Sequence, residues 1–274
     1  MRIKLFEQFV FEILNEGGKV FDDTSKIKKE HVDATVSDIE KNLFPIIGVN
    51  VKNVIRIGSS GHADISGDID FGIIGIPFED LYETLKDKFL NNEVNFIKGL
   101  EVLSISWPIS GTDSLVQVDM IPVYHEAWTK FVYKYPEESS YKSAHRNWLL
   151  MSILASIKNN LEVDEETDKP LEYDGYMMNL NKGLYSIKKD YHGKTKILKH
   201  GEIVKEKLIT SNPDEFVEFV FGKGIDPEDV GTFEKCWSII NKSDFKWSSK
   251  LEDIKKNLEK FLLRVELPIP TELK

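Results

Sequence analysis

The chain has 274 residues, of which 41% are hydrophobic and 30% charged, and its formal net charge is −10. This is the composition of a soluble globular protein, and the acidic balance argues against a surface that binds nucleic acid over its whole extent. The single cysteine, Cys236, excludes an intrachain disulfide and a cysteine-rich metal site.

The sequence pattern predicts neither a membrane span nor a signal peptide. No apolar run approaches the roughly 18 residues that a membrane span needs. The first residues lack the apolar core and cleavage site of a signal peptide, because Glu7, Glu12 and Glu16 interrupt them. We therefore expect a cytoplasmic protein with no membrane partner.

The first half of the chain predicts two helices followed by a sheet. Apolar residues recur at helical spacing over residues 3–16 and 26–44. Apolar runs bounded by Gly and Pro predict strands over 51–57, 69–74, 94–98, 101–107 and 115–121, with a short helix over 79–90.

The organisation changes after about residue 124. A long apolar helix is predicted over 143–161, followed by a possible hairpin region at 171–207. Pro213 and the acids after it mark a helix start that leads to Gly222, and residues 226–229 and 250–264 predict further helices. The predicted fold class is α+β, with a mixed-sheet catalytic domain over 1–140 and a mainly helical domain over 141–274.

The segment from Ile57 to Phe71 carries the strongest chemical signal. Asp68 and Asp70 are two residues apart in a strand, so both carboxylates project from the same face. Two adjacent anions need a cation between them, and a hard divalent metal is the usual one. The Gly58-Ser59-Ser60 turn just upstream offers backbone N–H groups and hydroxyls to a phosphate.

A third acid, Asp119, lies in the strand 115–121, where an aspartate is costly to bury without a partner. If this strand lies beside the strand 69–74, Asp119 joins Asp68 and Asp70. Three carboxylates can hold two Mg²⁺ ions, which clamp the attacking and leaving oxygens of an in-line displacement. The alternative for Asp119 is a solvated acid on an edge strand, and for Asp68 a turn-capping acid.

Taken together, the Gly-Ser turn, Asp68-Ile69-Asp70 and the later Asp119 resemble the polymerase beta-like nucleotidyltransferase superfamily over residues 45–123. The resemblance implies a nucleotidyltransferase-type mixed sheet flanked by helices, two Mg²⁺ ions (Mn²⁺ as a substitute) and release of pyrophosphate from a nucleoside triphosphate such as ATP. It implies that Asp68, Asp70 and Asp119 ligate the metals, and that Asp119 also helps to deprotonate the acceptor hydroxyl. Gly58 and Ser59 then contact the triphosphate, with Ser60 beside them.

The chain departs from many members in this turn. Where they place an arginine or lysine, it has Ser60-Gly61-His62-Ala63, and only eight residues separate Ser59 from Asp68. The compact turn resembles versions from bacteriophage proteins. Asp64 is a further acid in this loop, for which solvent exposure is the simpler interpretation.

The second half offers further candidates. Ser143, Arg146 and Asn147 fall on one face of a predicted helix, where they could bind the nucleotide; a polar first turn with Ser143 as cap is the equal alternative. His145 is more simply a structural histidine. Eight lysines lie within residues 181–207, either as an exposed charged hairpin or as a phosphate-binding patch.

The leading hypothesis is a Mg²⁺-dependent nucleotidyltransferase that acts on a hydroxyl of RNA, a small molecule or a protein. The rival is a catalytically silent nucleotide-binding or regulatory module of the same fold. A metal-dependent phosphohydrolase is a third hypothesis, and it would release inorganic phosphate instead of pyrophosphate.

Overall fold

The structure is a computed structural model that describes residues 20–89, 94–97, 101–157, 173, 175–190 and 202–273. The chain divides into two compact units, of which one ends at Glu137 and the next begins at Glu138. The predicted helix over 3–16 lies outside the described residues. No helix within the described ranges is long and apolar enough to cross a membrane.

The N-terminal unit is built on a mixed sheet with the strand order β2-β4-β7-β6-β5. β4 and β7 run parallel, and the other neighbouring pairs of this sheet are antiparallel. The strands are β2 (Val54–Ile57), β4 (Asp68–Ile74), β5 (Val94–Ile97), β6 (Val102–Pro108) and β7 (Leu115–Val123). The predicted mixed sheet flanked by helices is confirmed.

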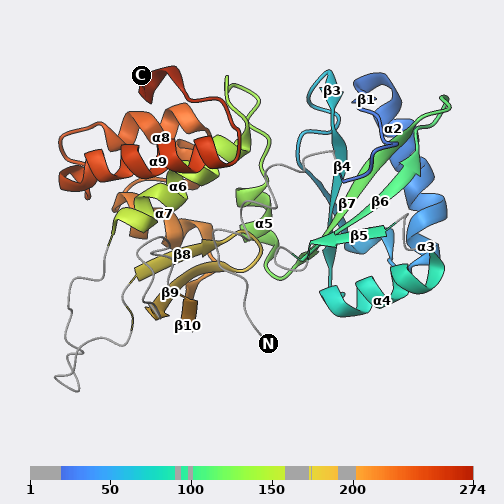
Figure 1. The fold of residues 1–274 in the computed structure, drawn as a ribbon, viewed down its shortest axis with the longest axis horizontal. Helices are drawn as coiled ribbons and strands as arrows, with labels where there is room; N and C mark the ends of the chain where they lie inside the picture. Colours follow the sequence, from blue (N-terminus) through green and yellow to red (C-terminus); the bar gives the residue numbers. More distant parts are fainter. Residues whose placement is uncertain are drawn as a thin grey trace. The chain divides into compact units, whose positions relative to one another are not determined.

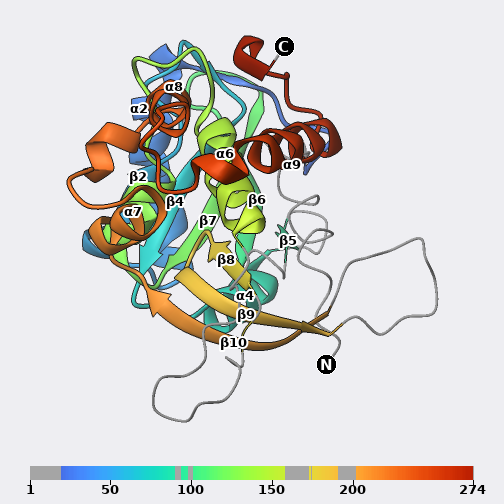
Figure 2. The ribbon, with the colours of Figure 1, turned by 90° about the vertical axis from the view of Figure 1, so that its left-hand side faces the viewer.

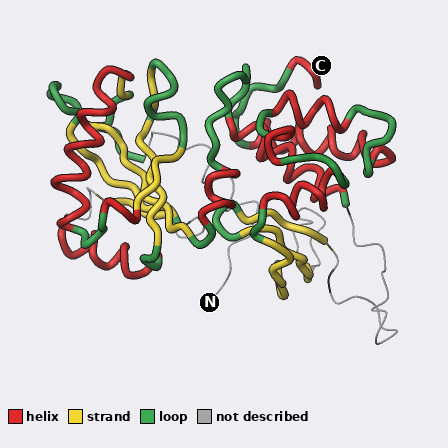
Figure 3. The backbone as a smooth tube through the Cα atoms, turned by 180° about the vertical axis from the view of Figure 1, so that it is seen from behind, coloured by secondary structure: helices red, strands yellow, loops and turns green. Residues whose placement is uncertain are grey.

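Helices cover one face of this sheet (Figures 1 and 3), and the strand residues on that face are apolar. Ile69, Phe71 and Val118 are buried there in one core with residues of the helices, such as Leu43 and Leu85. The helical segments of this unit are α2 (Lys29–Asp38), the π-helical η1 (Ile39–Leu43), α3 (Phe44–Ile46), the 3-10 turn η2 (Val51–Asn53), α4 (Phe78–Lys88) and α5 (Glu126–Val132). Burying this face fixes the direction of the other face, which carries the polar residues of the same strands.

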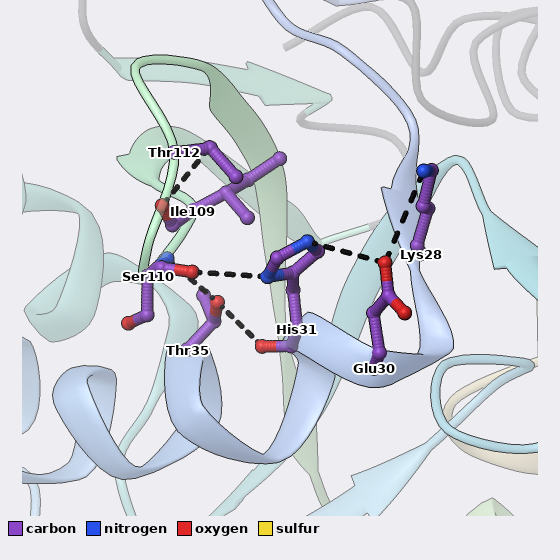
Figure 4. A network of polar contacts seen from close by, with 7 residues as sticks. All are labelled: Lys28, Glu30, His31, Thr35, Ile109, Ser110 and Thr112. Carbon is purple, nitrogen blue, oxygen red and sulfur yellow. Dashed lines mark hydrogen bonds and ion pairs between the residues drawn. The ribbon is translucent and has the colours of Figure 1, made fainter.

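The loop between β6 and β7 is attached to α2 by polar contacts (Figure 4). The Ser110 N–H donates to Thr35 Oγ1 at 3.0 Å, and Thr35 Oγ1 donates to the His31 carbonyl at 2.8 Å. His31 Nδ1 lies 3.2 Å from the Ser110 carbonyl, and its Nε2 lies 3.5 Å from Glu30 Oε1. Nearby, β1 (Ile27–Lys28) pairs with β3 (Ile65–Ser66). These contacts fix the end of the sheet at which β7 begins.

Several predicted boundaries in this unit were wrong. Residues 51–53 form a 3-10 turn, so that strand begins only at Val54. The helix expected from residue 26 begins at Lys29, because Ile27 and Lys28 pair with β3. β7 continues through Pro122, whose missing N–H is tolerated because the register with β6 ends at Met120 and only β4 pairs there.

The C-terminal unit combines helices with a three-stranded antiparallel sheet of order β10-β9-β8 (Figure 2). Its elements are α6 (Ser143–Ser156), β8 (Gly175–Asn179), β9 (Gly183–Asp190), β10 (Glu202–Thr210), α7 (Pro213–Phe221), η3 (Pro227–Val230), α8 (Phe233–Ile240), η4 (Ser248–Lys250), α9 (Leu251–Arg264) and η5 (Thr271–Leu273). The sequence predicted a two-stranded hairpin in this region, and the structure adds a third strand to it.

The helix boundaries of this unit have local causes. Asn212 caps α7 by accepting from the Asp214 N–H at 2.8 Å, and Gly222 ends the helix with a φ of 100°. α6 is shorter than the predicted 143–161, since Ile157 is extended, with φ −89° and ψ 109°. Where residues 226–229 predicted a helix, the structure has the 3-10 turn η3 (Pro227–Val230), with Asp226 as its N-cap.

Cys236 lies in the core of this unit. Its side chain is fully buried in α8, and its Sγ donates to the Val230 carbonyl at 3.3 Å. Burial raises the pKa of the thiol to about 12, against the smaller opposing effect of the Arg146 guanidinium. This cysteine is therefore a packing residue with an unreactive thiol.

Candidate metal and nucleotide site

The parallel pairing of β4 and β7 brings the three predicted acids together. Asp70 lies directly beside Asp119 in the register, and Asp68 lies beside Gln117. Each of Asp68, Asp70 and Asp119 offers a carboxylate oxygen, and these three oxygens all lie within 4.8 Å of one another. The predicted convergence of Asp119 with the Asp68–Asp70 pair is therefore confirmed.

The electrostatics of the cluster favour a cation. Burial, followed by the charges of Asp68 and Asp119, raises the pKa of Asp70 well above its usual value. The cost of holding three carboxylates this close is relieved when divalent cations share their charge. Carboxylate oxygens are also the ligands that Mg²⁺ prefers, so the residues present fit the expected metal.

Gln117 belongs to this site, although no role was predicted for it. It is buried, and its Nε2 donates to both carboxylate oxygens of Asp119, at 3.0 and 3.1 Å. Its Oε1 accepts from the Val20 N–H at 2.9 Å. The sequence feature that could have identified Gln117 is its position two residues before Asp119, which places both side chains on the same face of the strand.

Ser104 was also missed. It lies in β6 directly opposite Asp119 in the antiparallel register, so the two side chains share a face. Its side chain is 1% exposed, and its Oγ has no hydrogen-bond partner among the described residues. A buried hydroxyl without a partner beside an acid cluster is a group that bound ligand or water can satisfy.

Gly58 begins the predicted phosphate turn and touches the acid cluster. It has a φ of 76°, and a Cβ placed on it would lie 2.0 Å from Asp70 Oδ2. Both the backbone conformation and the close approach therefore require glycine. The Gly58 N–H donates to the Tyr133 carbonyl at 3.3 Å, so this amide is used within the unit.

The rest of the turn is folded tightly. The Ser59 carbonyl accepts from the N–H groups of His62 and Ala63, both at 3.1 Å. Ser60 is buried, and its Oγ has no hydrogen-bond partner among the described residues. Arg56 donates from Nη2 to the Ser60 carbonyl at 3.0 Å, which ties the turn to β2. The predicted roles of Ser59 and Ser60 toward a triphosphate remain predictions.

Two tyrosines that follow α5, Tyr133 and Tyr135, lie near the acid cluster and the turn. The charges of Asp70 and Asp119, after burial as the largest cause, raise the pKa of the Tyr133 hydroxyl. The Tyr135 ring stacks on His62 at 5.0 Å between centroids, and His62 Nδ1 lies 3.2 Å from Glu137 Oε1. These contacts hold His62 beside the turn. Many members of the superfamily that this chain resembles have an arginine or lysine in this turn, which this chain lacks.

The three candidates of the second half lie in the unit that begins at Glu138. Ser143 is the first residue of α6, and Arg146 is 1% exposed. Arg146 Nη1 donates to the Gly231 carbonyl at 3.3 Å, and Nη2 donates to Asn147 Oδ1 at 3.0 Å. Burial lowers the pKa of Arg146 to about 10. These contacts give Arg146 a structural role in its own unit; nucleotide binding by Ser143, Arg146 and Asn147 remains a prediction.

The other candidates of this unit are less informative. Burial lowers the pKa of His145, whose Nε2 lies 3.1 Å from the Pro268 carbonyl. Lys188 and Lys205 face each other in the register of β9 and β10. Residues 191–201, in the middle of the lysine-rich stretch, lie outside the described residues.

No protein-family model and no curated protein matches this chain. Solved structures similar to it include Leishmania infantum polymerase beta in a ternary P/T complex, at 12% identity and a TM-score of 0.40, with 76% of this chain and 77% of that chain covered. The ternary gap complex of the same polymerase aligns at 9% identity and a TM-score of 0.36, over 97% of this chain and 72% of that one. Likeness at this level carries no functional argument.

Proposed function

We propose that this protein is a Mg²⁺-dependent nucleotidyltransferase, which moves a nucleoside monophosphate from a nucleoside triphosphate to an acceptor hydroxyl with release of pyrophosphate. The observation that carries the proposal is the meeting of Asp68, Asp70 and Asp119 within 4.8 Å. They meet on adjacent strands, next to a glycine turn that touches Asp70. Two cations held by three carboxylates would supply charge neutralisation at the reacting phosphate.

The protein's own groups have distinct roles in this proposal. Asp68 and Asp70 hold cations beside the turn, where the triphosphate binds. Asp119 lies on the next strand, farther from the turn, and its carboxylate accepts the proton of the attacking hydroxyl or orients that hydroxyl. The tight turn at residues 58–61 presents its remaining backbone N–H groups to phosphate oxygens.

The strand order gives the reaction a direction. Across the sheet, Ile57 pairs with Asp70, Asp70 with Asp119, and Asp119 with Ser104. Ile57 directly precedes the turn, and Ser104 lies on β6. An in-line displacement needs the leaving group and the nucleophile on opposite sides of the phosphorus. The pyrophosphate would therefore leave toward the turn, and the acceptor hydroxyl would approach from the β6 side.

The test is to measure pyrophosphate release with Mg²⁺ and each nucleoside triphosphate, across RNA, small-molecule and protein acceptors. We expect release with at least one acceptor, and a loss of at least about a thousandfold in Asp70→Asn, because this variant removes a charged ligand. The matched control is Asp64→Asn, which removes a nearby loop carboxylate outside the cluster.

Other results would identify the rivals. Nucleotide binding without turnover over the whole acceptor panel would favour the silent module. Release of inorganic phosphate in place of pyrophosphate would favour a phosphohydrolase. Pyrophosphate release that persists in Asp70→Asn and in Asp68→Asn would contradict the proposed site.

A further inference from the structure

Asp119 accepts hydrogen bonds from the side-chain amide of Gln117. The Nε2 of Gln117 is almost equidistant from the two carboxylate oxygens, at 3.0 and 3.1 Å. A single donor at equal distances lies between the two oxygens, which is the position that a cation would take if it bound both of them. While this contact lasts, the amide donor occupies the space between the two oxygens, so a cation would bind a single oxygen of Asp119 and not both.

The orientation of the Gln117 amide is fixed. Its Oε1 accepts from the Val20 N–H at 2.9 Å, so the NH₂ group has to face Asp119. Gln117 is 1% exposed, and Asp119 is 9% exposed. Water therefore has little access to replace this hydrogen bond, and breaking it leaves buried polar atoms without partners.

The donor is also neutral. A lysine or arginine at this position would make the same kind of hydrogen bond but would cancel one of the three negative charges of the cluster. The amide orients the carboxylate and leaves its charge available. Ser104, the cross-strand neighbour of Asp119 on the other side, is likewise an uncharged buried group. Gln117 and Ser104, two neutral polar residues beside Asp119, thus leave its charge intact.

From these contacts we infer that Gln117 is a positioning residue for the cation site. It holds Asp119 as a ligand through one oxygen and keeps the full charge of the cluster, and it thereby sets the affinity for divalent cations. The inference rests on the proposed function, because it assigns Asp119 to the metal. It goes further by naming the neutral donor on which the third ligand depends.

The test measures Mn²⁺ binding to the protein without nucleotide, from the electron paramagnetic resonance signal of free Mn²⁺. Gln117→Leu removes the donor and adds no charge, and we expect Mn²⁺ affinity to fall about tenfold to a hundredfold. Gln117→Lys restores a donor but adds a positive charge, and we expect a larger loss of affinity than in Gln117→Leu. Turnover should follow, with kcat reduced and the KM for nucleotide within about twofold of wild type, since the turn is untouched.

Controls separate positioning from stability. Val118→Ala alters the neighbouring buried residue on the opposite face of β7, and it should lower thermal stability without changing Mn²⁺ affinity. If Gln117→Leu fails to fold, Gln117→Met, which matches the length of glutamine, replaces it. The Lys variant gives an independent result in either case.

The outcomes distinguish this inference from the proposed function. Wild-type Mn²⁺ affinity in Gln117→Leu and Gln117→Lys, with binding abolished in Asp70→Asn, would overturn the role of Gln117 and leave the metal site intact. Greater affinity loss in Gln117→Leu than in Gln117→Lys would refute the importance of neutrality. Mn²⁺ binding unaffected by Asp70→Asn would refute the metal site itself.

Discussion

At the scale of single residues, the site depends on a glycine that meets an aspartate. Gly58 combines a left-handed backbone with an approach so close that any side chain would collide with Asp70. Gly75 has a similar φ of 79°, but a Cβ there would have no neighbour within 4 Å. Substitutions at the two glycines therefore distinguish the effect of backbone strain from the effect of contact with the acid cluster.

We predict that Gly58→Ala and Gly75→Ala both lose about 1–2 kcal/mol of unfolding free energy, because alanine is strained at positive φ. Only Gly58→Ala should also lose Mn²⁺ binding and pyrophosphate release, since its Cβ displaces the Asp70 carboxylate. Urea denaturation and Mn²⁺ titration of the two variants check this. Equal Mn²⁺ affinity in both would show that the contact with Asp70 is unimportant.

The raised pKa of Asp70 has a consequence for stability in metal-free protein. As the pH rises from the usual carboxyl pKa of 3.8, the unfolded chain ionises first while folded Asp70 keeps its proton. The folded state then binds more protons, so stability falls as the pH rises toward the raised pKa of Asp70.

In EDTA, we therefore expect Asp70→Asn to be more stable than wild type at pH 8, and to lose this advantage near pH 4. Thermal melts over this pH range provide the measurement. In saturating Mg²⁺ the order at pH 8 should reverse, because wild type alone binds the cation. An advantage of Asp70→Asn that does not change with pH would mean that Asp70 ionisation is not its source.

Part of the site could be predicted at this scale and part could not. The aspartate pair and Asp119 could be predicted because an acid inside an apolar strand pattern demands a partner. Ser104 could not, because only the register of β6 against β7 places it opposite Asp119. The sequence alone contains no such register, and a serine in a strand is ordinary.

At the scale of elements, the site is set by strand pairing and by the loop contacts that hold the strands in place. The strands were predictable from apolar alternation, but their ends were decided by pairing partners, as at Ile27 and Pro122. The attachment of the β6–β7 loop to α2 through Thr35 joins residues that are far apart in sequence, and no local pattern could show it.

We predict that Thr35→Val costs about 1 kcal/mol more unfolding free energy than Thr84→Val. Both threonines donate to the carbonyl four residues earlier in a helix, at 2.8 Å in each case. Only Thr35 also accepts from a loop N–H, that of Ser110, at 3.0 Å. Chemical denaturation of the two variants measures the difference, and equal losses would show that the loop attachment contributes nothing.

The α6 candidate Arg146 can be tested in the same way. Because its guanidinium is buried and donates to Gly231, we expect Arg146→Leu to lose about 2–4 kcal/mol of unfolding free energy, and a nucleotide contact would in addition raise the KM for nucleotide in the folded fraction. Denaturation curves and initial rates check both parts. A raised KM with unchanged stability would instead establish the predicted nucleotide contact.

At the scale of the whole molecule, the acids lie in the unit that ends at Glu137, and the helices α6 to α9 lie in the unit that follows. A ligand stabilises the unit that binds it, by about 2.7 kcal/mol at a hundred times its dissociation constant. Cation binding and nucleotide binding can therefore be assigned to units by local protection.

We predict that Mg²⁺ alone slows amide hydrogen exchange in β4 and β7 and leaves α9 unchanged. Hydrogen exchange read by mass spectrometry, with Asp70→Asn as the control, measures this effect. Protection by Mg²⁺ that is confined to α9, or that persists in the variant, would contradict the assignment of the cation to the β4–β7 acids.

The buried thiol of Cys236 makes the protein convenient for fluorescence. A thiol with a pKa of about 12 and no exposed surface reacts poorly with maleimide dyes. Cysteines introduced at the exposed positions Ile65 and Leu263, one in each unit, would take up dyes while Cys236 stays unlabelled. Energy transfer between the two dyes would then report whether the distance between these positions changes when nucleotide is added, without any native cysteine having to be removed.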